Sequence, residues 1–180
     1  MELAGNVEEI LDFLASREGK LDAVVISGGE PCMQPDLDDF LAAVQALGYA
    51  VKLDTNGSYP DVLQSLIQAG LVDYIAMDIK GPLERYSDIA GVEVDASAIT
   101  RSIGIIEASG LPYLFRTTMA APLVGTEDIP RIRALIQNQE KLLLQACRTK
   151  DVLDPSRISE NQYTEEDLAV FAGSGGDAGV

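Results

Sequence analysis

The sequence of 180 residues is long enough for one domain, and it is strongly acidic, with 29 Asp and Glu residues, 13 Lys and Arg residues and a formal charge of −16 at pH 7. This charge argues against nucleic acid and against an anionic membrane surface as partners. The absence of histidine excludes histidine catalysis, and two cysteines, Cys32 and Cys147, are too few for a four-ligand zinc or cluster site. No apolar run approaches the roughly 20 residues of a membrane span, and no signal peptide is recognisable, so we expect a cytoplasmic protein.

Helical and strand patterns alternate along the chain. The predicted strands are apolar runs at 21–27, 50–54, 72–78, 112–118 and 141–146. An apolar stripe over 37–47, ended by Gly48, predicts one helix, and 83–89 predicts a short one. Because short polar side chains cap helix N-termini, further helices are predicted to begin after Asn6, Ser58, Asp95, Thr126 and Thr164.

This alternation indicates a parallel sheet with right-handed crossovers. Five such strands fit an open doubly wound sheet or part of a (β/α) barrel. The sequence has neither a Gly-x-Gly-x-x-Gly dinucleotide turn nor a P-loop. We therefore predict an α/β fold with one domain over residues 1–172, followed by a flexible glycine-rich tail over 173–180.

Polar residues stand at the end of every predicted strand. They are Ser27, Asp54, Asp78, Arg116 with Thr118, and Gln145. In parallel α/β folds, ligands bind at the carboxyl ends of the strands. Each residue alone also suits a helix cap or a loop, but the five strand ends together favour a binding site.

Two neighbouring turns add candidate ligand contacts. Gly28-Gly29 allows a ligand to approach the backbone, although such a pair is also an ordinary turn. Lys80 follows Asp78 by two residues and is suited to pair either with a ligand carboxylate or with Asp78 itself. An aldolase that uses Lys80 for a Schiff base is a further alternative, but it needs an uncharged amine in an apolar setting, which Asp78 opposes.

The chain resembles the radical S-adenosylmethionine (SAM) activating enzymes in stretches that have the family's order and spacing: VVISGGEPCMQPDLDDFL, GYAVKLDTNGSYPDVLQSLIQAGLVDYIAMDIKGP, FRTT, and LLLQACRTKDVLDP with YTEEDL. The resemblance covers about Val7 to Phe171. It is nearest to the activating proteins of anaerobic ribonucleoside-triphosphate reductase, cousins of pyruvate formate-lyase activating enzyme. It implies a partial TIM-like barrel, SAM as cofactor and a glycyl radical enzyme as partner.

The resemblance also implies roles for individual residues. Gly28, Gly29, Glu30 and Pro31 match the motif that binds the methionine amino group of SAM, largely through backbone oxygen. The segment of Asp54, Thr55 and Asn56 matches one near the ribose. Lys80 matches a lysine that contacts the methionine carboxylate, and Arg116 matches a strand-end arginine near the cofactor. Asp78 joins this set from the strand-end pattern.

The family's hallmark, Cys-x₃-Cys-x₂-Cys, does not occur in this sequence. In the family these thiolates hold a [4Fe–4S] cluster in a loop after the first strand. The resemblance thus implies that the first βα unit is missing, and no catalytic or metal-binding residue is predicted here. We expect this chain alone to be inactive, and to self-associate through an exposed edge strand at 21–27. The alternative is a non-catalytic relative that keeps the SAM pocket as a binding or scaffold module.

Overall fold

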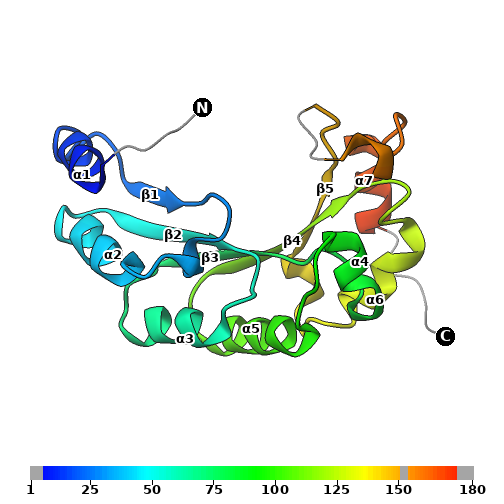
Figure 1. The fold of residues 1–180 in the computed structure, drawn as a ribbon, viewed down its shortest axis with the longest axis horizontal. Coiled ribbons are helices and arrows are strands. Elements are labelled where there is room, and N and C mark those ends of the chain that lie inside the picture. The colour runs from blue at the N-terminus through cyan, green and yellow to red at the C-terminus, as the bar shows by residue number, and fades with distance from the viewer. Residues whose placement is uncertain (1–5, 151–153, 174–180) are drawn as a thin grey trace.

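The computed structural model describes residues 6–150 and 154–173, and within them five parallel strands form one curved sheet (Figure 1). The strands are β1 (Ala23–Ile26), β2 (Ala50–Thr55), β3 (Tyr74–Asp78), β4 (Tyr113–Met119) and β5 (Leu142–Ala146). They pair in chain order, so β1 and β5 are the two edges among the described residues. All five predicted strands are confirmed, as is the α/β fold of a partial barrel.

The helices alternate with the strands as expected. They are α1 (Val7–Ala15), α2 (Leu37–Ala46), α3 (Pro60–Gln68), α4 (Tyr86–Ala90), α5 (Ala96–Ala108), α6 (Ile129–Arg133) and α7 (Glu165–Gly173). Helices α2, α3 and α5 lie along one face of the sheet, and α7 packs against β5 (Figure 1). No helix of the described residues lies over the middle of the opposite face (Figure 1). The sheet is therefore covered on one face and open on the other.

Side-chain alternation along the strands decides which residues enter the core. In β2, Val51, Leu53 and Thr55 are buried, whereas Lys52 and Asp54 are partly exposed. The buried strand residues pack against the apolar stripes of α2, α3 and α5, which include Leu41, Val44, Leu63, Leu66, Ile99, Ile103 and Ile106. Because successive side chains point to opposite faces, the polar residues of the same strands face the open side.

Most of the predicted helix starts are confirmed by side-chain caps, namely those of Asn6, Asp95 and Thr164. The cap predicted at Ser58 is wrong, because α3 begins after Tyr59. The Ser58 N–H instead donates to Asn56 Oδ1, which makes a tight turn after β2. This turn lies at the carboxyl ends of the strands, where the polar strand-end residues are.

The cap predicted at Thr126 is also wrong. Thr126 lies inside a 3₁₀ turn, and the buried carboxylate of Asp128 accepts a hydrogen bond from the Gly125 N–H. Arg85 pairs with the same carboxylate at 3.1 Å and fixes the turn. As a result α6 is shorter than the apolar pattern predicts.

The described helices include none that is long and apolar enough to cross a membrane. Helix α7 ends at Gly173, and residues 174–180 of the predicted tail lie outside the described residues. The domain boundary and the tail therefore stay predictions.

Candidate functional site

One arginine joins the carboxyl ends of three strands on the open face of the sheet. The register places Asp78 of β3 beside Arg116 of β4. Arg116 Nε donates to Asp78 Oδ1 at 2.8 Å, and its Nη1 donates to Asp54 Oδ2, on β2, at 3.0 Å. The strand-end residues that the sequence singled out on β2, β3 and β4 are thus brought together.

Two lysines extend this arrangement to a charged row of Lys52, Asp54, Arg116, Asp78 and Lys80. Lys52 Nζ lies 2.6 Å from Asp54 Oδ1, and Lys80 Nζ lies 3.2 Å from Asp78 Oδ2. Every carboxylate oxygen of the charged row therefore faces a cation. Three cations and two anions give the row a net charge of 3 − 2 = +1, in a protein of charge −16. The row consequently favours an anionic group of a ligand.

The three cations differ in how freely they reach a ligand. Burial opposes the charge of Arg116, but the charges and hydrogen bonds of Asp78 and Asp54 outweigh it and raise the pKa of Arg116 above its ordinary value. The Arg116 side chain is 18 % exposed, whereas that of Lys80 is 42 % exposed. Lys80 is therefore the more accessible cation. Its ion pair with Asp78 gives no support to the aldolase alternative, which needs an uncharged amine.

The Gly28-Gly29 turn after β1 is held by the side chain of Glu30. Gly28 has a φ of +149°, a backbone conformation that other residues rarely adopt. Glu30 Oε1 accepts hydrogen bonds from Cys32 N–H at 3.1 Å and from Thr55 Oγ1 at 2.8 Å. Glu30 Oε2 accepts one from Asn56 N–H at 2.7 Å. These bonds place the turn after β1 beside the turn after β2.

A cavity of about 180 Å³ opens between these two turns and the charged row. Its lining residues are Ser27, Gly28, Gly29, Glu30, Asp54, Thr55, Asn56, Asp78, Lys80 and Arg116. Nine of the ten predicted site residues are among them, whereas Pro31 is buried at the start of the 3₁₀ turn η1 (Pro31–Met33). Small-molecule pockets usually measure about 300–1,000 Å³, so this cavity suits one end of a ligand whose remainder lies on the open face.

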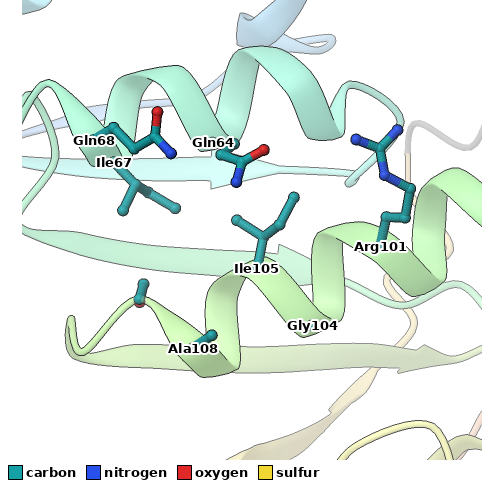
Figure 2. Close-up of a pocket in the computed structure, with 8 residues that line it drawn as sticks. Gln64, Ile67, Gln68, Arg101, Gly104, Ile105 and Ala108 are labelled. Atoms are coloured by element: carbon teal, nitrogen blue, oxygen red, sulfur yellow. The ribbon is translucent and has the colours of Figure 1, made fainter.

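Two other hollows differ from this cavity. Figure 2 shows one on the outer surface, where Gln64 and Ile67 of α3 face Arg101 and Ile105 of α5. The guanidinium of Arg101 is already paired with Asp61, so this hollow presents mainly amide and apolar groups. The second lies on β4 and β5 and takes in the remaining strand-end residues, Thr118 and Gln145.

Besides Lys52 of the charged row, sequence reasoning missed Tyr86, which supports the backbone of the site. Its hydroxyl accepts a hydrogen bond from Lys80 N–H at 3.2 Å and donates to the Asp78 carbonyl at 3.4 Å. Tyr86 is 3 % exposed and thereby fixes the backbone between the two charged residues. A tyrosine in a short helix after β3 gives no sequence signal for this contact.

We predict that the free energy of unfolding falls between about pH 9 and about pH 12. Burial, followed by the charge of Glu30, raises the pKa of Cys32 from 9.0 to about 12, and burial raises that of Tyr86 from 10.0 to about 12. The folded protein keeps protons that the unfolded chain releases, so this stabilisation is complete below the unfolded pKa values and is lost as the pH rises. Each group contributes a slope of up to about 1.4 kcal/mol per pH unit.

Chemical unfolding at several pH values from about 8 to about 11 measures this slope. The variants Cys32→Ala and Tyr86→Phe each remove one titrating group, so each should show a shallower decline than the wild type. A variant whose free energy of unfolding declines as steeply with pH as that of the wild type would contradict the assignment for the residue it replaces.

Comparison with known proteins shows the family of the chain. The Radical SAM superfamily model matches residues 3–137. The chain belongs to the radical SAM superfamily. Family membership implies SAM and a [4Fe–4S] cluster as cofactors, and it confirms the resemblance at the level of the superfamily.

Individual relatives and solved structures resemble the chain over most of its length. A Methanocaldococcus jannaschii protein that is named, provisionally, as a glycyl-radical enzyme activating enzyme is 34 % identical over 156 residues, which cover 82 % of this chain and 63 % of that protein. A domain of pyruvate-formate lyase-activating enzyme from Bacteroides vulgatus superimposes with a TM-score of 0.65 and 16 % identity, covering 85 % of this chain and 92 % of the domain. Streptococcus suis SuiB bound to S-adenosylmethionine has a TM-score of 0.72 and 15 % identity, covering 96 % of this chain and 40 % of SuiB. The chain thus spans less than two thirds of the M. jannaschii relative.

The cysteines of this radical SAM chain do not fit an iron–sulfur cluster. Among residues 6–150 and 154–173, no group of three or more His, Cys, Asp or Glu side chains is placed to hold a metal ion. Cys32 is 3 % exposed, and its N–H is bonded to the Glu30 carboxylate inside the protein, so this cysteine does not open onto the cavity. Cys147 follows β5, away from the Gly-Gly turn in sequence.

Proposed function

We propose that this chain carries the SAM-binding part of a radical SAM enzyme that activates a glycyl radical enzyme. The observation that carries the proposal is the cavity at the strand ends, whose lining combines the Gly28-Gly29 turn with the charged row. The relative from M. jannaschii supports the activating role. The specific partner type, an anaerobic ribonucleoside-triphosphate reductase, rests on the resemblance of the sequence motifs.

The groups that line the cavity suit the two charged ends of an amino acid. The carbonyl groups of the Gly28-Gly29 turn are suited to accept from the methionine ammonium group. Lys80, as a partly exposed cation, is suited to pair with the methionine carboxylate. The segment from Asp54 to Asn56 would lie near the ribose, and Arg116 would hold the strand ends in place. In the whole enzyme, SAM bound here would supply a 5′-deoxyadenosyl radical and release methionine once a [4Fe–4S] cluster delivered one electron, and that radical would abstract a glycine hydrogen from the partner.

Calorimetry with SAM and with its decarboxylated analogue tests this assignment. We expect saturable binding of one SAM per chain. Lys80→Met should weaken SAM binding about tenfold, as for loss of a hydrogen bond to a charged group, while hardly affecting the decarboxylated analogue. The control is Lys20→Met, because Lys20 lies before β1 and does not line the cavity. No heat from SAM up to millimolar concentration would contradict the proposal.

We predict that this chain alone does not cleave SAM. Reductive cleavage needs an electron delivered through the [4Fe–4S] cluster, and the 180 residues contain two cysteines. After reconstitution with iron and sulfide and reduction, no 5′-deoxyadenosine should form beyond the level of a Cys32→Ala, Cys147→Ala double variant. Turnover above that level would overturn the prediction. Because two cysteines are too few for the cluster, the sequence also favours the second candidate, a non-catalytic module that binds SAM.

Self-association through β1 is a further prediction. Among the described strands β1 pairs with β2 alone, and Val25 on β1 is 53 % exposed. An unpaired strand edge is a template for pairing with another chain. Sedimentation velocity should show dimers or larger species that decrease in the Val25→Lys variant, because a charged edge residue opposes pairing. A monomer at all concentrations would contradict it.

A further inference from the structure

We propose that Glu30 is a positioning residue, whose buried carboxylate holds the turn after β1 against the turn after β2 and does not itself contact the cofactor. This inference rests on the proposed SAM site, and it revises the role that the sequence resemblance gives to Glu30. We call Glu30, Cys32, Thr55 and Asn56 the Glu30 clamp.

The contacts of the Glu30 carboxylate are directed into the protein. Its two oxygens accept three hydrogen bonds, two of them from Thr55 and Asn56, which lie 25 and 26 residues further along the chain. A carboxylate offers about four acceptor positions, so most of its capacity is used within the Glu30 clamp. Glu30 is 7 % exposed, so a ligand has little access to what remains.

The Glu30 clamp continues into the helical layer. Thr55 Oγ1, which donates to Glu30, also accepts from Gly57 N–H at 3.1 Å. The Gly57 carbonyl in turn accepts from Ser102 Oγ at 2.7 Å, and Ser102 on α5 is fully buried. The turn after β2 is therefore anchored to α5, and Glu30 fastens the turn after β1 to this anchored turn.

A chemical consequence follows from this arrangement. Hydrogen bonds to an ionised carboxylate are roughly twice as strong as those between neutral groups. In Glu30→Gln one oxygen becomes an amide NH₂, which cannot accept, so either the bond from Cys32 N–H to Oε1 or the bond from Asn56 N–H to Oε2 is lost, and the remaining bonds are to a neutral group. The two turns should then separate, and the cofactor should bind less tightly although no group that contacts it has been removed.

The test uses Glu30→Gln together with the pair Thr55→Val and Thr55→Ser. The Val variant removes the hydroxyl that bridges Glu30 and Gly57, and the Ser variant keeps it. Amide hydrogen exchange measured by NMR reports on Cys32 and Asn56 without any ligand. Calorimetry with SAM, well below each variant's melting temperature, reports on the site.

We expect Glu30→Gln to speed exchange about tenfold at whichever of Cys32 and Asn56 faces the new NH₂, with β3 amides unchanged, and to weaken SAM binding by a similar factor. Thr55→Val should weaken SAM binding several-fold, and Thr55→Ser should restore it. Unchanged exchange in Glu30→Gln would overturn the inference. A second outcome would also overturn it: Glu30→Gln weakens SAM binding, but Thr55→Val and Thr55→Ser bind SAM with equal affinity. Glu30 would then act by direct contact with SAM. If the wild type binds no SAM, the proposed function fails, and the exchange comparison alone decides on the Glu30 clamp.

Discussion

Arg116→Ala should lower the free energy of unfolding by about 2–3 kcal/mol and abolish measurable SAM binding. The substitution leaves Asp54 and Asp78 facing each other without the guanidinium that joins them at 3.0 and 2.8 Å. Loss of one partner from a fully buried ion pair costs about 3–5 kcal/mol, and partial exposure of this site reduces that value. Because the three strand ends lose their common partner, the cavity should also lose its shape. Urea unfolding and calorimetry measure the two effects.

The control for this prediction is Arg101→Ala. Arg101 pairs with Asp61 at 2.6 Å, but the two side chains are 54 % and 84 % exposed. Exposed ion pairs contribute about 0–1 kcal/mol, so this variant should stay close to the wild type in stability and in SAM binding. Equal effects of the two arginine substitutions would show that the charged row has no special role.

Gly57→Ala should be at least as destabilising, by about 2–5 kcal/mol. Gly57 has a φ of +78°, and an added Cβ would lie 2.1 Å from Met77 Cε and 2.9 Å from Met77 Sδ. Met77 is fully buried, so its side chain has little room to move away. The strained backbone costs about 1–2 kcal/mol and the overpacking about 1–3 kcal/mol.

Gly70→Ala separates these two causes. Gly70 has a similar φ of +70°, but nothing lies within 4 Å of an added Cβ. This variant should therefore lose only the backbone term of about 1–2 kcal/mol. If thermal and urea unfolding give the same loss for both variants, contact with Met77 contributes nothing and the packing account of the turn is wrong.

The sequence predicts the fold well because the apolar stripes of helices and the apolar runs of strands are local patterns in the chain. Each apolar run with a polar residue at its end folds as a strand whose end lies at one edge of the sheet, as Asp54 and Asp78 show. Helix caps are less predictable, since a side chain such as Ser58 has several local partners and the Asn56 turn takes its N–H. Thr126 fails as a cap because a distant residue, Arg85, stabilises a different turn.

The sequence predicts which residues belong to the candidate site, but it does not predict the contacts that their side chains make. Parallel strands bring their ends together whatever the side chains do, so nine of the ten predicted residues line one cavity. The sequence does not reveal that Glu30 points into the protein, or that Tyr86 reaches back to Lys80, because both depend on side-chain packing between elements. The described residues bring no three His, Cys, Asp or Glu side chains together for a metal ion, which agrees with the absence of a Cys-x₃-Cys-x₂-Cys motif from the sequence.

The most direct test of the central claim is to map SAM on this chain by NMR. We predict that SAM shifts the amide signals of Gly28, Gly29, Asn56 and Lys80, which surround the strand-end cavity. The amides of Gly104 and Ala108, on the outer hollow between α3 and α5 (Figure 2), should not move. Shifts confined to that hollow, or no shifts at millimolar SAM, would contradict the assignment of the strand ends as the cofactor site.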